Sequence, residues 1–108
     1  MEILLSDPYF KEKNKAIACL YKVIDPELFV NIIDLGLVYA VDFIQTDRII
    51  IRMTLSTPAC PLGDAITAGV KNALTASFPD REVEVVLVWE PRWSLDMLTE
   101  AGRDQLGF

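Results

Sequence analysis

The chain has 108 residues, 52% of them hydrophobic, which is enough to bury one core, and we expect residues 1–108 to form a single domain. Its formal net charge of −6, from 16 acidic and 10 basic residues, disfavours nucleic-acid binding, which needs clustered Lys and Arg side chains. The absence of histidine excludes Ser-His-Asp and Cys-His nucleophile pairs and every His-based zinc site.

A first helix is predicted over residues 7–23, where apolar side chains such as Phe10 and Leu20 recur at helical spacing. Cys19 falls on the opposite, charged side of this helix, so we do not expect it in the core. The helix should end before residues 25–27 (Asp-Pro-Glu), because the residue before a proline is pushed out of the α region.

Three strands are predicted from alternating apolar and polar side chains, over residues 37–44, 48–56 and 83–89. The short polar turn between the first two predicts an antiparallel hairpin. Both faces of the third strand are largely apolar, so we expect it to be central or covered on both sides, with Trp89 packed in the core.

A second helix is predicted over residues 61–77, and a C-terminal helix should be capped at Ser94 or Thr99 and end near Gly107. The predicted order of elements is therefore α-β-β-α-β-α. This order indicates an α+β fold, a small mixed sheet of about three strands with helices packed against one face.

The sequence also predicts where the protein works. No basic leader precedes an apolar run, and no stretch approaches ~18 apolar residues, so we expect neither a signal peptide nor a membrane span. The two cysteines, Cys19 and Cys60, are too few for a disulfide framework or for a four-thiolate site within one chain. The expected compartment is a reducing cytoplasm.

Cys60 is the strongest candidate for a functional residue. Pro61 favours the first helical position, which places Cys60 at the N-cap of the second helix, where free N–H groups and the helix dipole favour a thiolate. Such a thiolate acts as a nucleophile or ligates a soft metal. The alternative is that Cys60 is a small buried residue in a tight loop. Its position in the sequence favours neither the functional nor the structural interpretation.

The turn formed by Asp25, Pro26 and Glu27 is the second candidate. Two carboxylates that flank a proline suit a hard cation, or polarise a neighbouring group. The more frequent role of such a sequence is structural, with the Asp side chain accepting hydrogen bonds from the local backbone, and the pattern favours this role. For Asp34 and Asp64, a structural role is favoured more strongly still.

Four short motifs follow one another along the chain: DPE, DLGLVY, TLSTPACP and PxW. They lie in the stretches VIDPELFVNIIDLGLVYAVDF (residues 23–43), MTLSTPACPLGDAI (residues 53–66) and VLVWEPRWSLDMLTEAGRDQLG (residues 86–107). Taken together, these stretches resemble the SufT-like and PaaD-like iron–sulfur assembly family, also described as metal–sulfur cluster biosynthesis domains. The resemblance covers about residues 17–107, and the ordered set of motifs is specific.

The resemblance implies a small α+β domain that supports the maturation of iron–sulfur proteins and is not itself an enzyme. By position, the family's signature cysteine falls on Cys60 and its acids on Asp25 and Glu27. Thr57 matches the threonine of the TPxC motif, where it could hydrogen-bond to the sulfur or cap the helix. The chain lacks the additional C-terminal cysteines of PaaD-type members, so a general SufT-like role is favoured.

On this basis we expect Cys60 to ligate iron or a labile iron–sulfur cluster transiently, or to contact a client's cluster site, with Asp25 as an assisting acid. One cysteine cannot fill the usual four-thiolate shell, so a homodimer, a small thiol or a partner would supply the other ligands. The expected partners are iron–sulfur assembly proteins and client apo-proteins. Two alternatives stay open: a cluster-free adaptor that docks on the assembly machinery or clients, and a thiol enzyme based on Cys60.

Overall fold

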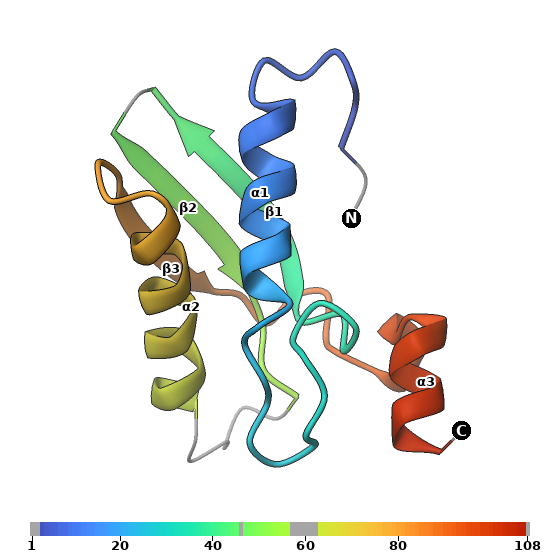
Figure 1. Cartoon of the computed structure of the whole chain (residues 1–108). Helices are drawn as coiled ribbons and strands as arrows, with labels where there is room; N and C mark the ends of the chain where they lie inside the picture. The colour runs from blue at the N-terminus through green and yellow to red at the C-terminus, as the bar shows by residue number, and fades with distance from the viewer. Residues whose placement is uncertain (1–2, 46, 57–62, 108) are drawn as a thin grey trace.

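The computed structural model describes residues 3–45, 47–56 and 63–107. The elements in chain order are α1 (Phe10–Leu20), β1 (Val38–Ile44), β2 (Arg48–Met53), α2 (Gly63–Ser77), β3 (Glu82–Leu87), the 3-10 turn η1 (Leu95–Met97) and α3 (Glu100–Leu106). This order, drawn in Figure 1, confirms the predicted α+β fold and its mixed sheet.

The sheet has the strand order β1-β2-β3. β1 and β2 pair antiparallel, with Val41 opposite Ile51, and β2 and β3 pair parallel, with Ile51 opposite Val85. The prediction that the third strand is central or doubly covered was wrong, because α2 carries the chain back to the outer side of β2. β3 is an edge strand in which none of the residues is fully buried.

Helices α1 and α2 lie side by side over one face of the sheet (Figure 1). Their inner sides, that face and the loop before β1 form the core, whose largest fully buried hydrophobic side chains are Leu20, Ile32, Leu35, Leu37, Ile49, Ile51, Met53 and Leu74. The opposite face carries two exposed cross-strand ion pairs, Arg52–Asp42 at 2.8 Å and Arg48–Glu84 at 2.7 Å. Within the described residues, no helix has the length and apolar character needed to cross a membrane.

Cys19 lies in the core and not on the solvated side of α1, so the prediction for this residue was wrong. Its side chain is only 6% exposed, and the thiol donates to the hydroxyl oxygen of Ser77 at 3.0 Å. Ser77 is the last residue of α2, so the C-terminal end of that helix covers the side of α1 that was expected to face water.

The C-terminal helix follows its predicted caps but does not pack on the sheet. The Thr99 hydroxyl accepts from the N–H of Gly102 at the N-terminus of α3, and Gly107 ends the helix in the left-handed region at φ 85°. The Thr99 N–H donates to the carbonyl of Asp34 at 2.9 Å. α3 therefore packs on the loop before β1, to one side of the two-layer body (Figure 1).

Candidate functional site

The site predicted from the sequence falls partly on residues whose positions are not described, because Thr57 and Cys60 lie in the gap between Ser56 and Gly63. The described residues on either side of that gap lie close together. A Cβ added to Gly63 would come within 2.8 Å of Leu55 Cδ1, so the Leu55 side chain packs directly on the Gly63 backbone. The chain thus leaves β2 and enters α2 at the same end of the molecule.

The acidic turn, which we define as residues 24–31, lies at this end as well (Figure 1). Asp25 is only 1% exposed, and its Oδ1 accepts hydrogen bonds from the N–H groups of Glu27 at 2.8 Å and Leu28 at 3.1 Å. Its own N–H donates to the carbonyl of Val30 at 2.9 Å. The side chain of Asp25 therefore holds the turn closed, as the structural interpretation of this motif predicted.

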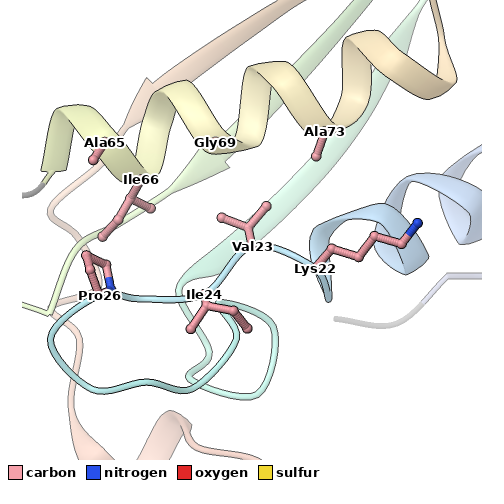
Figure 2. Close-up of a pocket in the computed structure, with 8 residues that line it drawn as sticks. All are labelled: Lys22, Val23, Ile24, Pro26, Ala65, Ile66, Gly69 and Ala73. Carbon is pink, nitrogen blue, oxygen red and sulfur yellow. The ribbon is translucent and has the colours of Figure 1, made fainter.

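A helix–turn groove of about 320 Å³ separates the acidic turn from α2, and Figure 2 shows it from the side. Its lining residues come from the acidic turn, from the two residues before it and from α2: Lys22, Val23, Ile24, Pro26, Ala65, Ile66, Gly69 and Ala73. On the α2 side the small residues Ala65, Gly69 and Ala73 follow one another at intervals of one turn, which leaves room for the groove. Pro26 lies beside Ile66 in the first turn of α2, so the acidic turn borders the start of the helix that follows Cys60.

The two acids of the turn have different environments. Asp25 points into the turn, whereas Glu27 is exposed to solvent. Among the described residues, no group of three or more His, Cys, Asp or Glu side chains is placed to hold a metal ion. The described part of the site is thus an ordered turn with one buried carboxylate and one exposed carboxylate beside a largely apolar groove.

A second cavity of about 280 Å³ also reaches the end of β2, and is lined by Thr54, Leu55, Ser56, Trp89, Glu90, Arg92 and Trp93. Trp89 is 42% exposed here, so its predicted place in the core was wrong, because β3 ends at Leu87 and Trp89 lies beyond the strand. Trp93 is half-buried and donates its indole N–H to the Leu35 carbonyl at 2.7 Å.

Tyr39 holds in place the segment around Pro91, next to this second cavity. Its hydroxyl donates to the carbonyl of Pro91 at 2.7 Å, which holds the segment between Glu90 and Arg92 against β1. Burial raises the pKa of Tyr39 above its ordinary value of 10.0. The phenol therefore keeps its proton at neutral pH and stays a hydrogen-bond donor.

Sequence reasoning missed two features near the site. The first is a polar cluster around the buried Asp34, whose carboxylate accepts from the side chains of the buried Asn31 at 2.7 Å and of the exposed Thr99 at 2.8 Å. The second is Phe29, which is 79% exposed and has a backbone φ of 59°. The cluster joins residues far apart in the sequence, and a positive φ at a bulky residue is too rare to expect from the residue type, so neither left a clear local signal.

The sequence of this chain is similar to known proteins over most of its length. A family model described as iron–sulfur cluster assembly protein matches residues 13–88. The chain is 41% identical over 96 residues to the Fe-S protein maturation auxiliary factor YitW of Bacillus subtilis (strain 168), covering 88% of this chain and 93% of that protein. It is 41% identical over 86 residues to the Fe-S protein maturation auxiliary factor SufT of Staphylococcus aureus (strain USA300), and the match covers 79% of this chain and 97% of that protein.

The fold has close counterparts among solved structures as well. The crystal structure of a domain of unknown function from Bacillus anthracis matches with a TM-score of 0.83 at 40% identity, over 88% of this chain and 91% of that one. The sequence resemblance is confirmed, and the chain belongs to the iron–sulfur cluster assembly protein family.

Proposed function

We propose that this protein is an auxiliary factor in the maturation of iron–sulfur proteins and acts as an accessory protein, not as an enzyme. The names of its relatives support this role, since those at 41% identity are called Fe-S protein maturation auxiliary factors. The proposed partners are iron–sulfur assembly proteins and client apo-proteins, and the proposed compartment is the cytoplasm.

Cys60 is the working residue in this proposal. It ligates iron or a cluster transiently, or contacts the client's cluster site, and Thr57 hydrogen-bonds to its sulfur or caps the helix. The observation that carries the proposal is the packing of the acidic turn against the first turn of α2 across the helix–turn groove. Cys60 precedes that helix by only three positions in the sequence, and in this proposal it acts together with the acids of the turn.

The two acids have separate tasks in this arrangement. Asp25 assists indirectly, because its Oδ1 already accepts two backbone hydrogen bonds and its side chain is almost fully buried. By closing the turn, it fixes the backbone at Glu27, an exposed residue whose carboxylate meets the cargo or the client in this proposal. A carboxylate so placed suits iron, and it also suits a cationic group on a partner.

Iron or the cluster is cargo in this proposal. One thiolate and one carboxylate fill only two positions of the usual four-ligand shell. A second copy, a small thiol or the partner protein would supply the remaining ligands. Occupancy is therefore labile, which suits a protein that hands its cargo on.

Anaerobic reconstitution with iron and sulfide tests the carrier role. Visible absorption and iron content are measured for the wild type, Cys60→Ser and Cys19→Ser. Cys19→Ser is the matched control, because a hydroxyl at position 19 can keep the hydrogen bond to Ser77. We expect the wild type and Cys19→Ser to gain a cluster and Cys60→Ser to gain none. Absence of iron from all three proteins would contradict carriage by the isolated chain.

A cluster-free adaptor is the second candidate function, and the exposed apolar side chains on the acidic turn favour it. Ile24 is 49% exposed and Phe29 is 79% exposed, so the turn presents a surface suited to a protein partner. The adaptor role predicts that Cys60→Ser still supports the activation of client proteins in cells while substitutions on the turn abolish it.

A further inference from the structure

Phe29 occupies a conformation that neither its size nor its burial explains. Its φ of 59° lies in the left-handed region, where the Cβ of an L-residue crowds the following carbonyl oxygen. In a core, favourable packing could offset such strain, but the Phe29 side chain is 79% exposed. The folded chain thus holds a large aromatic side chain in water at a cost in backbone strain.

We propose that Phe29 is a docking residue that inserts into an apolar pocket with a cationic rim on a partner protein. This inference rests on the proposed function, since it names the surface by which the auxiliary factor engages the assembly machinery or a client. Residues held in unfavourable backbone conformations cluster at binding and switch sites, because function maintains a geometry that stability alone would not.

The acidic turn fixes the backbone on both sides of Phe29 by hydrogen bonds. The N–H of Phe29 donates to the carbonyl of Asp25 at 2.8 Å, and the N–H of Asp25 donates to the carbonyl of Val30 on the other side of Phe29 at 2.9 Å. The buried Asp25 carboxylate adds two further hydrogen bonds within the same turn. A residue on such a pre-ordered turn loses little backbone freedom on binding, which favours affinity.

Other apolar residues of the acidic turn, Ile24 and Pro26, are exposed as well. Ile24, on the same turn, is 49% exposed, and both Ile24 and Pro26 line the helix–turn groove (Figure 2). An aromatic anchor flanked by smaller apolar contacts is the usual arrangement at the centre of a protein–protein interface. We therefore expect the partner to cover the turn and the adjoining wall of the groove.

Charge decides which kind of partner fits. Glu27 is exposed two residues before Phe29, and the whole chain carries a net charge of −6. An anionic lipid surface would repel a chain with this net charge, and self-association would bring two such negatively charged chains together. A protein pocket with Lys or Arg on its rim complements both the aromatic ring and the adjacent carboxylate.

The test separates docking from folding by removing the side chain and the strain together. Glycine and asparagine tolerate the left-handed region, so we expect Phe29→Gly and Phe29→Asn to melt no lower than the wild type. Gln45→Gly is the matched control, because Gln45 has a φ of 53° and is exposed in the turn between β1 and β2. It relieves the same kind of strain and leaves Phe29 in place.

The functional readout is the activity of iron–sulfur enzymes in cells that lack their own copy of this protein and express each variant at equal level. Loss of a buried Phe side chain weakens binding by roughly tenfold or more. We therefore expect both Phe29 variants to restore little activity and Gln45→Gly to restore it fully. Full restoration by Phe29→Gly, or a melting temperature that falls in parallel with activity, would overturn the docking role.

Two further measurements test the class of partner and the proposed function. Sedimentation velocity should show no self-association that depends on Phe29, and flotation with phosphatidylglycerol vesicles should show no lipid binding that depends on Phe29. Self-association or lipid binding that Phe29→Gly abolishes would contradict a partner protein as the ligand of this surface. If the wild type restores activity and Phe29→Gly does as well, only the docking role fails. If the wild type restores none, the proposed function itself fails.

Discussion

Thr99 and Asp34 hold two distant parts of the chain together through paired hydrogen bonds. The Thr99 hydroxyl donates to Asp34 Oδ1 at 2.8 Å, and the Thr99 N–H donates to the Asp34 carbonyl at 2.9 Å. Asp34 lies in the loop that follows the acidic turn, and its carboxylate also accepts from Asn31. The C-terminal segment is thereby fastened to the part of the fold that carries the proposed site.

Thr99→Val should destabilise the protein by about 1–3 kcal/mol, because it removes a donor to a largely buried carboxylate and the N-cap of α3. Thr99→Ser keeps the hydroxyl and should lose much less. Urea unfolding of the two variants and the wild type measures the difference. Equal stability of Thr99→Val and Thr99→Ser would show that the hydroxyl contributes nothing to the attachment.

Gly36→Ala should be far more harmful than Gly107→Ala, although both glycines have a positive φ, of 73° and 85°. A Cβ at Gly36 would collide with the backbone carbonyl of Met97, whereas a Cβ at Gly107 meets nothing within 4 Å. We expect about 1 kcal/mol of conformational strain at Gly107 and more than about 2 kcal/mol of destabilisation at Gly36. Thermal unfolding checks the order, and similar losses would rule out the close approach of Met97 to the loop before β1.

Asp25→Asn and Asp25→Ala separate the structural and chemical roles of this acid. Asparagine keeps an Oδ1 acceptor for the N–H groups of Glu27 and Leu28, so stability should change by less than about 1 kcal/mol. Alanine leaves both N–H groups without that acceptor and should cost about 2 kcal/mol or more. The same variants are tested for restoring iron–sulfur enzyme activity in cells that lack this protein. If Asp25→Asn folds well but restores no activity, the carboxylate has a function besides closing the turn. If Asp25→Asn restores activity, the only function of the carboxylate is to close the turn.

Asp7 should make stability depend on pH in acid. The side-chain hydrogen bond from Lys13 at 2.7 Å, with the Tyr9 N–H, lowers the pKa of Asp7 below its ordinary value of 3.8. A lowered pKa means that the stabilisation is present above 3.8 and is lost as the pH falls through the folded-state pKa. The difference in stability between the wild type and Asp7→Asn should therefore disappear below that pKa. A difference that persists unchanged at pH 2 would contradict this assignment.

Much of the fold could be predicted from local patterns. Alternation such as Ile49, Ile51 and Met53 identifies a strand with one buried face, and Thr99 and Gly107 mark the ends of α3 by their chemistry alone. These signals act over a few residues. They therefore predicted the type and order of the elements correctly.

The errors concern neighbours that local patterns cannot specify. The apolar faces of the third strand suggested a central position, but the connection through α2 places it at the edge beside β2. Cys19 was assigned to solvent from α1 alone, and Ser77 at the end of another helix buries it. Asp25 was recognised as a turn residue, whereas the partnership of Asp34 with Thr99 spans 65 positions and depends on tertiary contact.

The burial of Cys19 makes this thiol a reporter of motion between α1 and α2. With 6% of the residue exposed and its sulfur bonded to Ser77, a thiol reagent reaches position 19 only when the two helices separate. In a Cys60→Ser protein, the rate of labelling at Cys19 therefore measures how often the helical layer opens. A partner that binds across α2 and the acidic turn would slow this labelling, so one sulfur atom in the core can register an event on the surface.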